Sequence, residues 1–325
     1  MKRMAGLMVV MLLLSGCSQS REVHKNLFAM DTYMELTAYG SSAESALEQA
    51  QQELLRLDAM LDRKGEGELA RINQEGEGSV SAETAEILSV ALQLAEKTEG
   101  AFDPTVGALM DAWGFYDGQM CVPEESELAQ ALEQVGYEKI SLKDNTVNTN
   151  GTLLDLGGIA KGYAGDRLCQ ILRQAGITSA ILSLGGNVQT VGKKPDGSLW
   201  QVAVADPEQP KEYACSLAVE DQAVITSGGY QRRMIQDGRE YHHILDPKTG
   251  QPADTGLLSV TVVGDCGMIC DALSTALYVM GLEQGTAYWR EQGDFEAIFI
   301  TKDTLYYTPG LCPEQTGDRK VVCLK

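Results

Sequence analysis

The chain has 325 residues, with 46 acidic and 26 basic side chains, a formal net charge of −20 at pH 7 and an isoelectric point near 4.5. This balance excludes nucleic acid as a partner, because a phosphate backbone is bound through clustered Lys and Arg, and the sequence has no such cluster. An apolar content of 44% together with 34 glycines is typical of a folded globular protein with many turns.

The chain begins with a basic start and a short apolar run that ends in "LSGC". The run is too short to span a bilayer as a mature helix, which predicts a signal peptide over residues 1–17. The ending resembles a bacterial lipobox, with Cys17 as the lipidated residue; an ordinary signal peptide with an incidental cysteine is the alternative. We therefore expect a chain that is exported and lipid-anchored to the extracytoplasmic face of a bacterial membrane, with a tether over 18–26 and one domain over 27–325.

Helical spacing of apolar residues dominates the first half of this domain, and strand patterns dominate the second half. This order predicts an α+β fold in which helices cover sheets, built as a compact two-lobed unit. In chain order we expect a strand over 28–40, helices over 43–61, 67–73 and 82–98, a loop over 101–115, a helix over 124–135, a hairpin over 139–150 turning at Asp144-Asn145, a helix over 160–175, strands within 180–192, 200–207, 213–228 and 257–264, a helix over 270–280, and closing strands.

Seven cysteines remain once Cys17 is set aside, and they form no paired C-x-x-C framework. Cys266 and Cys270 have the spacing of zinc ligands, but no second pair or nearby His completes a tetrahedral set, which favours buried small hydrophobic residues. A bridge between Cys312 and Cys323 is left open.

The stretch "DLGGIAKGY", residues 155–163, leads into a predicted helix. Paired glycines let a backbone approach a ligand closely, and the start of a helix directs free N–H groups and a positive dipole end toward it. Phosphate suits such a loop, although a tight turn with a surface lysine explains the same residues. The pattern is neither a Walker A loop nor a Rossmann fingerprint.

Asp271 and Thr275 lie four residues apart in "CDALSTALYVMG", so a helix places them on one face. A carboxylate and a hydroxyl on one face suit a hard cation such as Mg²⁺, completed by carbonyl and phosphate oxygens. The alternative is a capping or buried, hydrogen-bonded Asp. A cation at this position explains how an acidic chain tolerates an anionic ligand.

Two further stretches contain candidate catalytic or ligand-binding side chains. "HHILDPKTG" holds two of the three histidines, and His is the usual general base near neutral pH, although an isolated His in a strand is often only packed. "AFDPTVGALMDAWGF" places Phe102 and Asp103 at a rigid Asp-Pro turn, which either lines a pocket for an aromatic ligand or anchors a loop.

Taken together, these stretches resemble the ApbE family of FAD:protein FMN transferases. The matching motifs run in family order from the first predicted strand to the last predicted helix: "FAMDTYMEL", "GELARIN", "GAFDPTVGALMDAWGF", "DLGGIAKGYAGD", "SLGGNVQTVG", "ITSGGYQRRM", "HHILDPKTG" and "VTVVGDCGMICDALSTALYVMG". The resemblance implies the ApbE-like fold and a Mg²⁺-dependent enzyme that uses FAD as a substrate. Such an enzyme attaches FMN by a phosphoester bond to Thr or Ser of an acceptor flavoprotein, such as a redox-pump subunit, and releases AMP.

The resemblance also implies roles for individual residues. His243 is the implied base, and Gly158, Asp271 and Thr275 are the implied metal ligands. The implied FAD-binding residues are Met30, Ala101, Phe102, Asp103, Asp155, Lys161 and Leu245.

The sequence departs from the family pattern at Asp31, where the usual Met-Gly-Thr is Met30-Asp31-Thr32. Two alternative functions remain beside the transferase. One is an FAD pyrophosphatase that releases FMN and AMP, and the other is a flavin-binding lipoprotein without turnover.

Overall fold

A computed structural model describes residues 21–325 except 117, 210 and 316. Its α-helices are α1 Ala43–Leu61, α2 Glu68–Glu75, α3 Ala82–Lys97, α4 Gly107–Ala112, α5 Glu125–Leu132, α6 Ala160–Gln174 and α7 Gly267–Gln292, with 3-10 turns η1 Tyr137–Lys139 and η2 Gly229–Gln231. Its strands are β1 Glu22–Ala29, β2 Thr32–Tyr39, β3 Glu77–Ser79, β4 Ser141–Lys143, β5 Thr146–Asn148, β6 Ser179–Leu184, β7 Asn187–Gly192, β8 Trp200–Ala205, β9 Tyr213–Val219, β10 Ala223–Gly228, β11 Arg233–Gln236, β12 Arg239–His242, β13 Leu257–Gly264, β14 Glu296–Thr301, β15 Thr304–Tyr307, β16 Glu314–Gln315 and β17 Lys320–Cys323.

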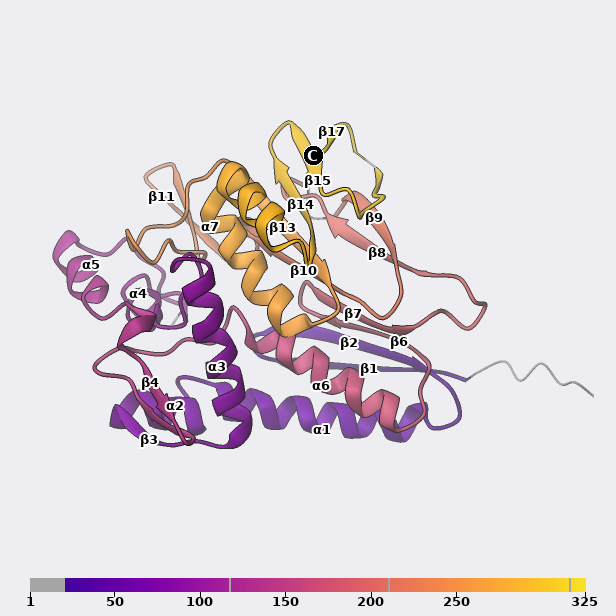
Figure 1. Cartoon of the computed structure of the whole chain (residues 1–325), viewed down its shortest axis with the longest axis horizontal. Coiled ribbons are helices and arrows are strands. Elements are labelled where there is room, and N and C mark those ends of the chain that lie inside the picture. The colour runs from indigo at the N-terminus through magenta and orange to yellow at the C-terminus, as the bar shows by residue number, and fades with distance from the viewer. Residues whose placement is uncertain (1–20, 117, 210, 316) are drawn as a thin grey trace, which may run out of the picture.

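A nine-stranded sheet in the order β1-β2-β6-β7-β10-β13-β14-β15-β17 forms the centre of the molecule. Helices α1, α6 and α7 lie side by side along one face of this sheet (Figure 1). Each contributes a buried apolar stripe; in α1 this stripe runs at helical spacing from Ala43 to Leu61. The large buried cluster between helices and sheet therefore forms the main core.

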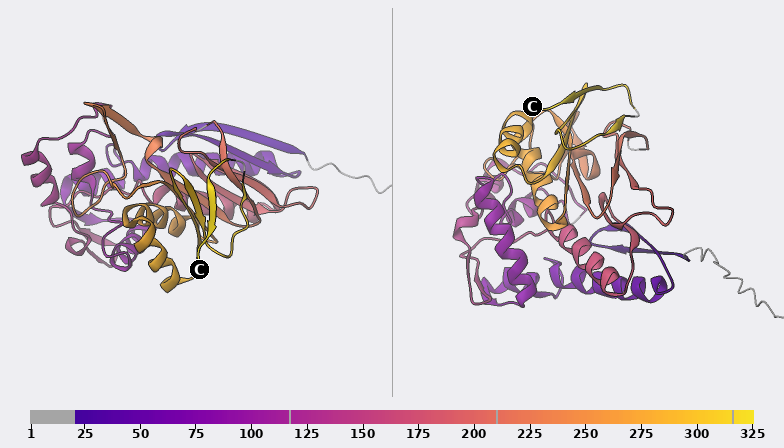
Figure 2. Two further views of the ribbon diagram at one scale, coloured as in Figure 1. Left: turned by 90° about the horizontal axis from the view of Figure 1, so that it is seen from above. Right: turned by 45° about the vertical axis from the view of Figure 1, so that its right-hand side comes forward.

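The opposite face of the sheet is covered by a smaller sheet in the order β16-β9-β8, which packs through Trp200, Val202 and Leu217 against Val224 and Ile298. Helices α2 to α5 and the β3-β5-β4 sheet gather at one end of the molecule (Figures 1 and 2). Part of this end has its own core around the fully buried Trp113, whose Nε1 donates to the Gly250 carbonyl at 2.8 Å. The predicted α+β architecture of sheets covered by helices is confirmed.

The start of the domain differs from the prediction. Residues 22–26, expected to belong to a tether, form the first half of β1, and the strand expected over 28–40 is a hairpin of β1 and β2. Its two-residue turn is Met30-Asp31, both at positive φ (48° and 58°). Met is not a typical turn former, and Asp31 occupies the second turn position, where glycine is usual, so the strand pattern concealed the turn.

Most other expected elements are present with small shifts. The helix over 43–61 and the hairpin turning at Asp144-Asn145 are confirmed. The expected loop over 101–115 contains the short helix α4, and the helix expected over 270–280 lies in the first half of α7, which runs on through a kink at Gly281.

Among the described cysteines, all seven are free thiols, so the bridge between Cys312 and Cys323 is absent and both side chains are exposed. Cys270 is buried and Cys266 is half-buried, as expected for packing residues. In the part of the chain described here, no helix is long and apolar enough to cross a membrane.

Candidate active site

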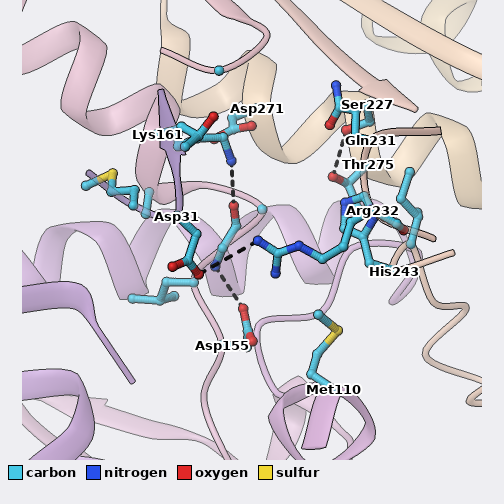
Figure 3. A pocket seen from close by; sticks show the side chains of 18 of the residues that line it. Asp31, Met110, Asp155, Lys161, Ser227, Gln231, Arg232, His243, Asp271 and Thr275 are labelled. Atoms are coloured by element: carbon cyan, nitrogen blue, oxygen red, sulfur yellow. Dashed lines mark hydrogen bonds and ion pairs between the residues drawn. The ribbon is translucent and has the colours of Figure 1, made fainter. Parts of the chain in front are cut away.

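A cavity of about 760 Å³ opens between the β1–β2 turn, the loop before α6, the start of α7 and the β11–β12 region. Figure 3 shows the cavity from close by, with Asp155, Lys161, His243, Asp271 and Thr275 labelled. The cavity contains all the site residues predicted within the described chain. These are Met30, Ala101, Phe102, Asp103, Asp155, Gly158, Lys161, His243, Leu245, Asp271 and Thr275. Cys17, the predicted lipidation site, lies outside the described residues.

The loop before α6 forms one wall of the cavity. Asp155 accepts a hydrogen bond from the Gly157 amide at 2.8 Å, and Lys161 donates to the Gly157 carbonyl at 3.2 Å (Figure 3). A β-carbon at Gly158 would lie 3.2 Å from the Phe102 ring, so only glycine fits here without crowding. The expected set of free amides is largely wrong, because the amides of Gly157, Ile159, Ala160 and Gly162 all donate within the protein.

Asp271 reaches the cavity at the crossing of α6 and α7. Its Oδ2 accepts from the Gly162 amide at 2.8 Å, and its side chain is buried. A β-carbon at Gly162 would lie 2.2 Å from the Gly267 carbonyl oxygen and 2.7 Å from the Asp271 β-carbon. Glycine at 162 therefore permits the close helix contact that fixes this carboxylate.

Hydroxyl groups surround the Asp271 end of the cavity. Ser227 Oγ lies 2.7 Å from Ser274 Oγ and 3.2 Å from Thr275 Oγ1. A β-carbon at Gly158 would lie 3.6 Å from the same Thr275 oxygen, so the loop backbone comes close to the start of α7. The structure thus assembles the predicted Gly158, Asp271 and Thr275 and adds Ser227, a residue that the sequence analysis did not single out.

This donor set fits a small hard cation. It consists of one carboxylate, two hydroxyls and a backbone carbonyl, all oxygen, which is the chemistry that Mg²⁺ prefers when phosphate oxygens complete its shell. Among the described residues there is no group of three or more His, Cys, Asp or Glu side chains that could hold a metal ion. The predicted metal ligands do not form such a group, because Asp271 is the single residue of those four types among them. The other predicted ligands are hydroxyl and carbonyl oxygens.

The structure distinguishes the two neighbouring histidines. His243 lines the cavity, whereas His242 packs edge-on against Tyr278 with ring centroids 5.4 Å apart. His243 Nδ1 lies 3.2 Å from the Arg232 carbonyl, which only accepts, so Nδ1 carries the proton. The other ring nitrogen, Nε2, is therefore the one with a lone pair available to accept a proton.

Burial and the nearby Arg232 cation lower the pKa of His243 to about 3. An unfolded chain would hold this histidine at its ordinary value near 6.5, so the unfolded state binds more protons below that pH. We expect the free energy of unfolding to fall as pH is lowered from about 6.5 to about 3, and to fall less in a His243→Gln variant. Urea unfolding at several pH values measures this difference, with the exposed His24→Gln as matched control; parallel curves for wild type and His243→Gln would contradict it.

Asp103 has a different environment from the one that the resemblance suggests. Its carboxylate accepts from the amide and hydroxyl of Thr105, at 2.8 and 2.6 Å, and from the Tyr137 amide at 3.1 Å. Burial raises the pKa of Asp103. The side chain thus holds the 101–105 loop in shape, and this loop in turn presents Ala101 and Phe102 to the cavity.

Two cations that were not predicted from the sequence lie around the half-buried Tyr116. Arg63 and Arg232 lie on the Tyr116 ring, 5.2 and 5.6 Å from its centroid. Arg63 stands in a stretch that indicates only a charged turn, and Arg232 stands in a family-like motif without an assigned role. Asp58, which accepts from the Met30 amide at 2.9 Å, was also missed, because its partner is 28 residues away.

Comparison with known proteins identifies the family to which this chain belongs. The family model described as "ApbE family" matches residues 30–299, which include all the described residues of the predicted site. The chain belongs to the ApbE family.

Two relatives of this ApbE-family chain are each called FAD:protein FMN transferase. One, from Treponema pallidum, is 32% identical over 89% of this chain and 87% of its own length. The other, from Vibrio cholerae, is 32% identical over 90% of this chain and 91% of its own length. The family expected from the ordered motifs is therefore confirmed.

Solved structures of the family share the fold. The ApbE protein of Thermotoga maritima superposes with a TM-score of 0.82 at 31% identity, covering 91% of this chain and 97% of that one. The flavin transferase ApbE of Vibrio cholerae gives a TM-score of 0.81 at 29% identity, covering 89% and 97%. The ApbE-like fold predicted from the motifs is confirmed.

Proposed function

We propose that this chain is a Mg²⁺-dependent FAD:protein FMN transferase. The observation that carries this proposal is that His243 lines the same cavity as the Asp271 and Thr275 oxygens of α7. The names of the relatives support the same reaction. The substrate is FAD, and the second substrate is an acceptor protein that presents Thr or Ser in a flavinylation motif.

In the proposed reaction, the acceptor hydroxyl attacks the phosphorus of the FMN half of FAD. A new phosphoester bond forms, the pyrophosphate P–O bond breaks, and AMP leaves. The hydroxyl proton passes to Nε2 of His243, which the Arg232 carbonyl orients through Nδ1. A bound anion raises the pKa of a nearby histidine, so the substrate itself strengthens this base.

Asp271, Thr275, Ser227 and the Gly158 carbonyl are the residues that would hold Mg²⁺. When bound, the ion neutralises charge on phosphate oxygens and lowers the barrier to phosphoryl transfer. Phe102, Met30 and Leu245 supply apolar surface of the kind that a flavin ring requires.

We also propose that the mature chain is exported and attached to a bacterial membrane through lipidated Cys17. The basic start, the short apolar run and the lipobox-like ending support this. An anchored enzyme outside the membrane would meet acceptors such as redox-pump subunits or extracytoplasmic flavoproteins.

The test is incubation of the chain from Ser18 onward with FAD, Mg²⁺ and an acceptor domain bearing a threonine flavinylation motif. We expect the intact mass of the acceptor to rise by one FMN, and EDTA to prevent the rise. Release of AMP and free FMN without a mass gain would instead indicate an FAD pyrophosphatase. Bound FAD with neither product would indicate a flavin-binding protein without turnover.

A further inference from the structure

The side chains that line the cavity carry a net negative formal charge, which disfavours an anionic ligand. The lining includes three cations and six aspartates, a net formal charge of 3 − 6 = −3. The cations are Arg63, Lys161 and Arg232, and the aspartates are Asp31, Asp58, Asp62, Asp103, Asp155 and Asp271. The amides before α6 are largely occupied, so these three cations are the main attraction that the lining itself offers an anion when no metal ion is bound.

Arg63 is not available to a ligand. Its guanidinium makes two hydrogen bonds to Asp111, at 2.8 and 3.0 Å, and a third to the Gly107 carbonyl at 3.1 Å. It also lies 3.7 Å from Asp155, and the side chain is only 7% exposed. Arg63 therefore neutralises two fixed aspartates, and its remaining nitrogen, Nε, is buried and faces Asp155.

Arg232 is held much more loosely. Its Nη2 lies 3.7 Å from Asp31 Oδ2, and its Nη1 donates to the Phe115 carbonyl at a long 3.5 Å. The side chain extends across the cavity toward Asp31, with His243 at its base (Figure 3). Because the two side chains are 31% and 66% exposed, their ion pair is weak and easily exchanged for a stronger anion.

Asp31 is itself unusual at its position. It occupies the left-handed second residue of the β1–β2 turn, a position that favours glycine, at φ 58°. The acid thus lies in the cavity lining at the end of the paired β1–β2 hairpin, 3.7 Å from Arg232.

We propose that Arg232 binds the phosphate groups of the flavin nucleotide in addition to the predicted Lys161, and that Asp31 holds this guanidinium across the cavity until the nucleotide displaces it. This inference rests on the proposed function, because it takes the ligand to be a phosphorylated flavin. Asp31 competes with the ligand for one cation, so it lowers the affinity for phosphorylated flavins and leaves the affinity for riboflavin unchanged.

The test measures flavin binding by fluorescence quenching in EDTA, which prevents turnover. We expect Arg232→Gln to weaken FAD binding about tenfold or more, since a hydrogen-bonded charge is lost. We expect Asp31→Asn to tighten FAD binding about threefold, as removal of a weak competing ion pair implies. Riboflavin, which has no phosphate, should bind the wild type and both variants equally.

The matched control is the neighbouring ion pair Arg233–Glu240 at 2.8 Å, which lies outside the cavity lining. Arg233→Gln and Glu240→Gln should leave FAD binding unchanged. Weaker FAD binding by Asp31→Asn would show that the Asp31–Arg232 ion pair only stabilises the fold. An equal loss of FAD and riboflavin binding by Arg232→Gln would show that Arg232 does not bind phosphate. Either result would overturn this inference but not the proposed function, provided that the wild type still binds FAD and releases AMP. A wild type that binds no FAD would overturn the proposed function as well.

Discussion

Asp271→Ala is expected to abolish Mg²⁺-dependent turnover, with a loss of about 1,000-fold or more, equivalent to ~4 kcal/mol of barrier. The reason is that Asp271 supplies the only carboxylate in the proposed cation site. AMP release measured over a Mg²⁺ titration checks the result. Because the Gly162 amide also loses its acceptor, the alanine variant should lose about 1–3 kcal/mol of stability as well.

Asp271→Asn separates these two effects. The amide oxygen of asparagine is able to accept from Gly162, while the negative charge is gone. We expect this variant to unfold close to the wild-type temperature and still to lack Mg²⁺-dependent activity. Full activity in the asparagine variant would remove Asp271 from the metal site.

His243→Ala is expected to slow FMN transfer by about 10²- to 10⁴-fold, the usual contribution of a positioned general base. FAD binding should survive, because the ring does not supply charge at neutral pH when its pKa is lowered to about 3. Single-turnover transfer to the acceptor gives the rate, and flavin fluorescence gives the affinity.

His242→Ala is the matched control for this variant. The two rings are adjacent in sequence, but His242 packs against Tyr278 and does not line the cavity. We expect the control to keep the wild-type transfer rate. Equal transfer by His243→Ala and the wild type would exclude His243 from the mechanism.

Local patterns predicted much of this fold. The apolar spacing of α1 and the Asp144-Asn145 turn are decided by neighbouring residues, and both are where the sequence places them. The Met30-Asp31 turn escaped prediction because its backbone is dictated by pairing across eight residues on each side, not by its own composition. Sequence rules favour glycine at such a turn, and this chain does not use it.

In the candidate site, too, residues placed by local spacing were predictable, and residues placed by distant contacts were not. Asp271 and Thr275 were predictable, because helical spacing alone puts them on one face. Arg63 was not, since its partners Asp111 and Asp155 lie 48 and 92 positions further on. The resemblance to a family supplied the role of His243, and the choice between His243 and His242 follows from which ring faces the cavity.

The cavity wall draws on both ends of the domain, from Phe28 on the first strand to Thr275 on the last helix. Contacts this distant in sequence form late, because the entropy of closing the long intervening chain must be overcome first. A nascent chain, or one threaded unfolded through a membrane channel, therefore carries no competent site. The transferase activity of this protein therefore requires completion of the fold.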